Sequence, residues 1–268
     1  MTSPITLVIG ASRGIGLELV KQISQDPSQQ VIGSVRKPTD LGTAPNIKSI
    51  VLDQADRSSV KAAATQVSEL DTLIINAAIG DDEKVLTTSD ERLAEYSNVN
   101  VGGPLRVVQE FLPALLARQT RRIIVISSQS GSLETQINVV GGFSGPYSIS
   151  KAAVNMVVVQ LHNELRDRKF TLQAIHPGWV ATDMGGVTGP GGMPIPQSVE
   201  GVLRRVNEVT HEDSPRFVSW DGIGFYIMKS RGSLHETKAS IDYPIACILF
   251  VLLAFGSLFS TLLGLFFK

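Results

Sequence analysis

The sequence has one cysteine, few aromatic residues and almost no net charge, and each shortage excludes a class of protein. The single cysteine, Cys247, excludes an internal disulfide framework and a cysteine-rich zinc site, and we expect no metal. Aromatic residues make up 6% of the chain, and the formal net charge is −1 at pH 7. A nucleic-acid groove needs a basic stripe, so no nucleic-acid partner is expected. Residues 1–4 carry no basic segment, which indicates that the chain has no N-terminal signal peptide.

Hydrophobic residues, by contrast, make up 43% of the 268 residues, which is enough for a packed core. Short apolar strands alternate with helical patterns over residues 5–175. The predicted strands are 5–9, 31–35, 50–52, 73–75, 123–126 and 172–175, and the predicted helices are 15–25, 57–69, 89–117 and 147–166. The third helical stretch is one helix or two, with boundaries or kinks at Pro104 and Pro113. Continuous apolar strands between helices predict an α/β fold with a doubly wound, Rossmann-like parallel sheet.

A glycine-rich turn follows the first strand and opens the first helix. Glycine allows a tight turn and close approach of a pyrophosphate, and the helix N-terminus offers free N–H groups to its charge. The spacing G-x3-G-x-G differs from the common G-x-G-x-x-G. The assignment therefore rests on the strand that precedes the turn and the helix that follows it. We expect a dinucleotide to be bound by Gly10, Ser12, Arg13, Gly14, Ile15 and Gly16.

The end of the second strand favours NADP over NAD. NAD-binding units usually place an acid there to hold the ribose 2′-OH, whereas this strand runs into Arg36 and Lys37. Arg36 and Arg13 can both face a 2′-phosphate, and the alternative is that both are ordinary solvated arginines. Asp53, after the third strand, either hydrogen-bonds the adenine edge or caps a helix.

Several polar residues fall where a catalytic site of such a sheet would lie. Tyr147 and Lys151 are four residues apart and therefore share one helix face. Ser128 follows the strand 123–126, Asn76 follows the strand 73–75, and Asn100 lies in the helical stretch between them. Doubly wound sheets bind ligands at the carboxyl ends of their strands, so these side chains are expected to converge.

With these motifs the sequence resembles the short-chain dehydrogenase/reductase family over about residues 5–222. Within the family it is similar to the C-factor-like and sniffer-type carbonyl reductases and to fungal ketoreductases of the norsolorinic-acid type. Two features depart from the usual pattern. Asn76-Ala77-Ala78-Ile79 replaces the common Asn-Asn-Ala-Gly, and the interval from Ser128 to Tyr147 is longer than in most members.

The resemblance implies a role for each matching residue. Tyr147 would protonate a carbonyl oxygen as hydride arrives, and Lys151 would lower the pKa of the phenol and bind the nicotinamide ribose. Ser128, in preference to Ser127 or Ser130, would hold the substrate oxygen, and Asn100 would anchor a proton-relay water. Thr182 would hold the nicotinamide carboxamide. The other residues implied in cofactor binding are Asn76, Ala77, Pro177, Gly178 and Val180.

The chain is therefore expected to be an NADPH-dependent reductase of a ketone or aldehyde, with a role in polyketide-type secondary metabolism. Two alternatives stay open, namely an NADP-dependent secondary-alcohol dehydrogenase and a dinucleotide-binding interaction protein without turnover. Phe143, Trp179, Met184 and Met193 indicate an apolar substrate, and residues 185–196 form a Gly- and Pro-rich loop beside it. A homo-oligomer is compatible with this reading.

The C-terminal residues differ from the rest of the chain. Residues 245–267 form an uncharged run of 23 residues, and Lys268 is the single charge in 243–268. Such a run spans about 35 Å as a helix, which exceeds a bilayer core of about 30 Å. The sequence predicts a domain over 1–222, a connector over 223–242 and a transmembrane helix over 243–268. Basic residues before the run place the domain on the cytosolic side. The alternative is a cytoplasmic protein whose last helix packs on protein.

Overall fold

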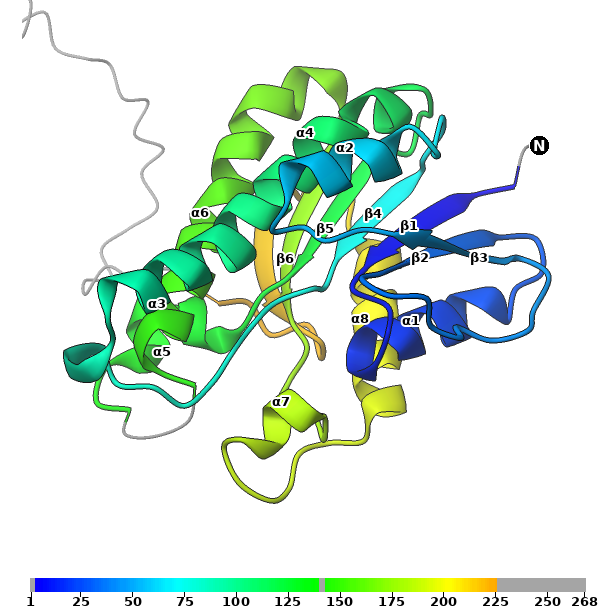
Figure 1. The fold of residues 1–268 in the computed structure, drawn as a ribbon. Helices are drawn as coiled ribbons and strands as arrows, with labels where there is room; N and C mark the ends of the chain where they lie inside the picture. Colours follow the sequence, from blue (N-terminus) through cyan, green and yellow to red (C-terminus); the bar gives the residue numbers. More distant parts are fainter. Residues whose placement is uncertain (1–2, 140–142, 226–268) are drawn as a thin grey trace, which may run out of the picture. The chain divides into compact units, whose positions relative to one another are not determined.

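The computed structural model describes residues 3–139 and 143–225, and within them seven parallel strands form one sheet (Figure 1). The sheet order is β3-β2-β1-β4-β5-β6-β7, and every neighbouring pair is parallel. The strands are β1 (Ile5–Ile9), β2 (Gln30–Val35), β3 (Ile47–Val51), β4 (Thr72–Ile75), β5 (Arg122–Ile126), β6 (Thr171–His176) and β7 (Arg216–Ser219). The doubly wound fold that the sequence predicts is confirmed.

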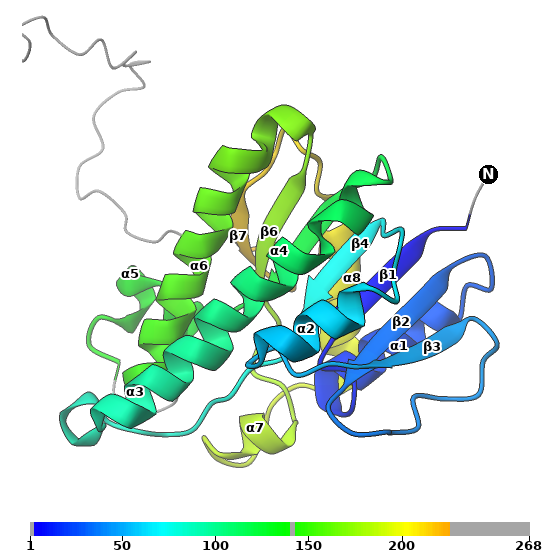
Figure 2. The same ribbon diagram turned by 45° about the horizontal axis from the view of Figure 1, so that its top comes forward.

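Helices cover both faces of the sheet, which explains why the strands are apolar without alternation. Leu7 and Ile9 of β1 pack into the core on one side, and Val8 between them packs into the core on the other. Figure 2 shows the two helical layers. One layer holds α2 (Arg57–Ala64), α4 (Gly103–Leu116) and α6 (Gly145–Leu165), and the other holds α1 (Gly14–Ser24) and α8 (Ile195–Glu208).

The predicted helical stretch over 89–117 is three elements rather than one or two. They are α3 (Asp90–Tyr96), the π-helix η2 (Ser97–Gly102) and α4. Pro104 lies in the first turn of α4, where its missing N–H costs nothing, so the boundary predicted there is confirmed. Pro113 lies inside α4 and does not end it. The π-helix carries Asn100, and such local widening often occurs at functional sites.

One helix is shorter than the sequence predicts, and one strand is not predicted from the sequence. The helix expected over 57–69 ends at Ala64, and β7 was not predicted because only two of its four residues are apolar. The short helices that complete the described fold are α5 (Leu133–Gln136), α7 (Asp183–Gly186), η1 (Val85–Thr87), η3 (Gln129–Gly131) and η4 (Arg166–Arg168).

The chain reverses its direction of travel across the sheet at β1. The strands β2 and β3 lie on one side of it, and β4 to β7 lie on the other. Ligands of doubly wound sheets bind at this switch point, at the carboxyl ends of the strands. Within residues 3–139 and 143–225, no helix has both the length and the hydropathy to cross a bilayer. The predicted transmembrane helix over 243–268 and most of the predicted connector lie outside the described residues.

Candidate active site

The glycine-rich turn joins β1 to α1 at the switch point. Gly10 and Gly14 have φ values of 82° and 57°, which L side chains rarely adopt. A Cβ on Gly16 would lie 2.0 Å from the carbonyl oxygen of Gly10, so Gly16 allows the helix to pack under the turn. No side chain caps the N-terminus of α1 and its first turn carries no acid. A helix N-terminus of this kind can bind an anionic ligand through its backbone N–H groups.

A cavity of about 960 Å³ opens along the carboxyl ends of the strands, beside this turn. Thirteen of the residues predicted to bind the cofactor line it, namely Gly10, Ser12, Arg13, Gly14, Ile15, Arg36, Asp53, Asn76, Ala77, Tyr147, Lys151, Pro177 and Thr182. Five other predicted site residues do not line it: Gly16, Asn100, Ser128, Gly178 and Val180. The glycine-rich turn, the uncapped helix N-terminus and a cavity of this volume together fit a dinucleotide.

Charged residues surround the end of the cavity near β2. Arg36 follows β2, and no acid takes the place that would hold a ribose 2′-OH. Arg13 forms an ion pair of 2.7 Å with Asp183 of α7, and both side chains are mostly exposed. The carboxylate of Asp53 accepts a hydrogen bond from the backbone N–H of Ala55 while the residue lines the cavity. The helix-cap alternative for Asp53 is wrong, because the N-cap of α2 is Asp56, and the contact with the adenine edge stays a prediction.

Tyr147 and Lys151 lie one turn apart on α6, and both are buried. Lys151 Nζ donates a hydrogen bond of 2.9 Å to the carbonyl oxygen of Ile126 and lies 5.6 Å from the centre of the Tyr147 ring. Burial raises the pKa of Tyr147 to about 12, and a hydrogen bond with Ser128 partly opposes this. Burial lowers the pKa of Lys151 to about 8. The phenol is therefore protonated at neutral pH, as a general acid must be.

The two serines after β5 have different partners. Ser127 Oγ donates a 2.6 Å hydrogen bond to Asn155 Oδ1 in the interior. Ser128 Oγ accepts a hydrogen bond from the backbone N–H of Ser130 and interacts with the phenol of Tyr147. Ser127 lines the cavity and Ser128 does not, but the Ser127 hydroxyl is already paired with Asn155, whereas Ser128 lowers the pKa of the Tyr147 phenol. That Ser128 holds a substrate oxygen stays a prediction.

Asn100 is buried and joins the π-helix to two other parts of the site. Its Oδ1 accepts a hydrogen bond from the backbone N–H of Ile79, and its Nδ2 donates to the carbonyl oxygen of Ile79 and to Ser150 Oγ. Asn76 makes a similar connection, since its Nδ2 donates to the carbonyl oxygen of Gly10. Both amides therefore fix the loops that border the cavity.

The structure adds residues that sequence reasoning missed. A Cβ on Gly80 would lie 2.9 Å from two ring carbons of Tyr147 and 3.2 Å from Met184 Sδ. The Phe143 ring lies 4.8 Å from the Tyr147 ring. Phe143 and Met184, predicted as substrate contacts, thus lie around the phenol. Gln54 lines the cavity and donates to the carbonyl oxygens of Ala77 and Val99. A lone glycine or glutamine gives no sequence signal for such a role.

His176 ends β6 and does not line the cavity. Burial lowers its pKa to about 4, so the imidazole is neutral at pH 7. Its ring packs edge-on against Phe225 at 5.7 Å. These contacts agree with a structural role. Among the described residues, no three His, Cys, Asp or Glu side chains gather closely enough to hold a metal ion.

Comparisons with known proteins give one consistent family. A family model described as short chain dehydrogenase matches residues 4–190. An uncharacterised oxidoreductase of Schizosaccharomyces pombe is 34% identical, over 82% of this chain and 97% of its own length. The C-signal protein of Myxococcus xanthus is 38% identical, over 61% of this chain and 97% of its own length. The structure of an NADPH-bound carbonyl reductase from chicken fatty liver is 29% identical, with a TM-score of 0.75, and the match covers 84% of this chain and 99% of that one.

Proposed function

Since the chain belongs to the short-chain dehydrogenase family, and is thus an oxidoreductase, we propose that it is an NADPH-dependent carbonyl reductase. The observation that carries the proposal is the buried Tyr147–Lys151 pair beside Ser128, at the end of a cavity that begins at the glycine-rich turn. The NADPH-bound relative of similar fold supports the same chemistry and cofactor.

The residues of the turn hold the cofactor in this proposal. The N-terminus of α1 faces the pyrophosphate, and Arg13 and Arg36 bind the 2′-phosphate, since guanidinium groups match phosphate geometry. Lys151 binds the nicotinamide ribose and Thr182 the carboxamide. When bound there, NADPH supplies the hydride that reduces the carbonyl carbon.

Tyr147 supplies the proton. Ser128 donates a hydrogen bond to the substrate oxygen and holds it beside the phenol, so that the phenol proton passes to that oxygen as negative charge develops. The positive charge of Lys151 favours the phenolate that remains. Lys151 and water held near Asn100 would then return a proton from solvent to Tyr147. One hydride and one proton convert the carbonyl to the alcohol.

The substrate in this proposal is an apolar ketone or aldehyde. Phe143 packs against the Tyr147 ring, and Ile79 and Met184 line the same cavity as Tyr147. The exposed ring of Trp179 lies on the loop that follows β6. A substrate with an aromatic or aliphatic body would bury this surface against them, whereas a charged one would lose hydration.

The test is NADPH oxidation, followed at 340 nm, against a panel of aromatic, aliphatic and charged carbonyl compounds. We expect turnover with apolar members, weaker turnover with NADH, and little with charged members. Tight NADPH binding without turnover of any member would contradict the proposal and favour a binding protein. Turnover only in the direction of alcohol oxidation would favour the dehydrogenase alternative.

A further inference from the structure

The segment of residues 79–84, which we call the wall segment, connects β4 to η1 and lies against the catalytic phenol. Gly80 approaches the Tyr147 ring so closely that a Cβ there would lie 2.9 Å from it, and Ile79 lines the cavity. At its other end, Glu83 packs its carbonyl oxygen against Gly145, the first residue of α6. The position of the wall segment therefore affects the helix that carries Tyr147 and the surface around its ring.

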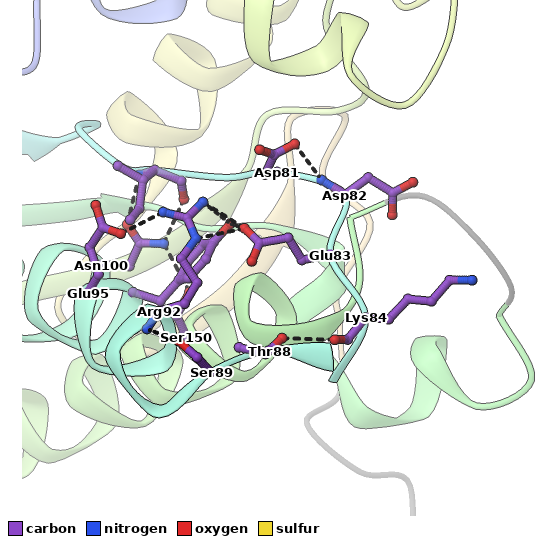
Figure 3. A network of polar contacts seen from close by, with 12 residues as sticks. Asp81, Asp82, Glu83, Lys84, Thr88, Ser89, Arg92, Glu95, Asn100 and Ser150 are labelled. Atoms are coloured by element: carbon purple, nitrogen blue, oxygen red, sulfur yellow. Dashed lines mark hydrogen bonds and ion pairs between the residues drawn. The ribbon is translucent and has the colours of Figure 1, made fainter. Parts of the chain in front are cut away.

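A charged pair holds this segment to α3. Arg92 Nε and Nη2 both donate to Glu83 Oε1, at 2.8 and 2.6 Å, and Arg92 Nη1 donates to Glu95 Oε2 at 2.6 Å. Figure 3 shows the Glu83 and Arg92 side chains pointing toward each other from the loop and the helix. Both side chains of the pair are partly buried, so solvent screens them less than it screens a fully exposed pair.

Tyr96 adds a second connection, and no step of the proposed reaction uses it. Its side chain is fully buried, its hydroxyl donates to Glu83 Oε1 at 3.0 Å, and the guanidinium of Arg92 lies 4.7 Å from its ring centre. Tyr96 is close enough to Tyr147 to contribute to raising the Tyr147 pKa.

The wall segment is thus fixed at two places along its length. Asn100 binds both backbone groups of Ile79, and Arg92 with Tyr96 binds the side chain of Glu83. Buried polar atoms are costly unless they are paired, so a paired group of this kind favours a single geometry. Gly80 lies between these two places.

We propose that Glu83, Arg92 and Tyr96 are positioning residues that hold the wall segment against the Tyr147 ring, so that the phenol faces the substrate oxygen. They touch neither substrate nor cofactor and act through Gly80 and the start of α6. The inference rests on the proposed function for the role of Tyr147. Since a displacement near 1 Å can cost about a hundredfold in rate, partial loosening should lower kcat markedly.

The experiment compares Glu83→Gln and Tyr96→Phe with the matched control Glu110→Gln. Glu110 also pairs with an arginine, Arg57, and its side chain is as exposed as that of Glu83, at 24%, but it lies on α4 and does not line the cavity. For each full-length protein we would measure kcat and KM with the best carbonyl substrate, the Kd for NADPH by fluorescence, and hydrogen exchange of the peptide that covers the wall segment.

We expect Glu83→Gln and Tyr96→Phe to lower kcat about tenfold. This is less than the hundredfold loss of a 1 Å displacement, because each variant loosens the wall segment only in part. NADPH affinity should stay within about twofold of the wild type, because the contacts at the glycine-rich turn are intact. The wall segment should exchange faster in both variants, and Glu110→Gln should match the wild type in every measurement.

The inference would be overturned if Glu83→Gln and Tyr96→Phe both had the same kcat as the control Glu110→Gln. A loss of kcat without faster exchange would also overturn it, since the effect would then not pass through the wall segment. Tyr96→Phe removes one oxygen only, so it tests the inference even if Glu83→Gln fails to fold. A wild-type protein that reduces no carbonyl would instead contradict the proposed function, and the exchange data would still decide whether the network fixes the segment.

Discussion

Burial moves the pKa values of Tyr147 and Lys151 in opposite directions, to about 12 and about 8, so that both groups are held toward their neutral forms. From the sequence, we expected the lysine charge to lower the pKa of the phenol. In the structure, desolvation is the larger influence on that pKa, and the hydrogen bond with Ser128 is what opposes it. The sequence could place the two residues on one helix face, but it could not predict how dry their surroundings are.

This burial predicts that Lys151→Met stabilises the fold while it removes activity. The fall of the Lys151 pKa from 10.5 to about 8 corresponds to roughly 3 kcal/mol, at 1.36 kcal/mol per pKa unit. Loss of the hydrogen bond to Ile126 offsets about 1 kcal/mol. Urea unfolding at pH 7 should therefore show a gain of about 2 kcal/mol in the free energy of unfolding. Lys61→Met, at an exposed position on α2, is the control and should change it little.

The same substitution has a defined pH dependence. Because the folded-state pKa of Lys151 lies below its unfolded value, the wild type gains stability as the pH rises from about 8 toward 10.5. The gain in the free energy of unfolding of Lys151→Met over the wild type should have its largest value below pH 8 and should become smaller above it. A difference that stays constant from pH 7 to 9.5 would show that the ammonium is not the source of the cost.

Gly80 carries a second prediction at this scale. In Gly80→Ala the new methyl group would meet the Tyr147 ring at 2.9 Å and Met184 Sδ at 3.2 Å, so the phenol must shift. We expect kcat to fall by about a hundredfold, with NADPH affinity unchanged. Gly224→Ala is the control, since nothing lies within 4 Å of the position of its Cβ. Wild-type kcat in Gly80→Ala would show that this contact does not set the position of the phenol.

At the scale of elements, the strands were the most predictable part of the fold. All four residues of β4 are buried between two helical layers and three of them are apolar, a pattern typical of an interior parallel strand. The π-helix could not be predicted, because its place depends on hydrogen bonds from Asn100 to a loop about 20 residues earlier. Gly80 and Tyr96 were missed for the same reason, since their roles arise from contacts between distant segments.

The ion pair between Arg13 and Asp183 connects the glycine-rich turn to α7 and gives a prediction about cofactor choice. Asp183 competes with a 2′-phosphate for the Arg13 guanidinium, whereas NADH offers no such group. Asp183→Asn should therefore tighten NADPH binding about two- to fivefold relative to NADH, which is the size of effect expected from an exposed ion pair. Fluorescence titration with both cofactors measures it. An equal change for both would mean that Arg13 does not bind the 2′-phosphate.

At the scale of the whole molecule, the sheet explains why residues from many separate segments reach one cavity. Parallel strands end at the same edge, and the reversal at β1 leaves a crevice there. Most of the predicted cofactor residues line this cavity, because motifs placed directly after strands are carried to that edge by the topology itself. Other residues, such as Gly16 and Asn100, were predicted as contacts and do not line it.

The membrane prediction also belongs to this scale, and it rests on the sequence of residues 243–268 alone. If that run spans a bilayer, the full-length protein should stay in the membrane pellet after carbonate extraction and should be released by detergent. Leu253→Arg would place a charge near the middle of the run, at a cost of about 3 kcal/mol, and should shift the protein toward the supernatant. A wild-type protein found in the supernatant without detergent would contradict the prediction.

The central claim is that Tyr147 donates the proton in carbonyl reduction, and Tyr147→Phe tests it most directly. The substitution removes one oxygen from a buried ring and leaves the packing with Phe143 and Gly80 intact. With the best carbonyl substrate, we predict that kcat falls by a factor of about 10² to 10⁴ while the Kd for NADPH stays within about twofold. A variant that binds NADPH and keeps the wild-type kcat would contradict the claim.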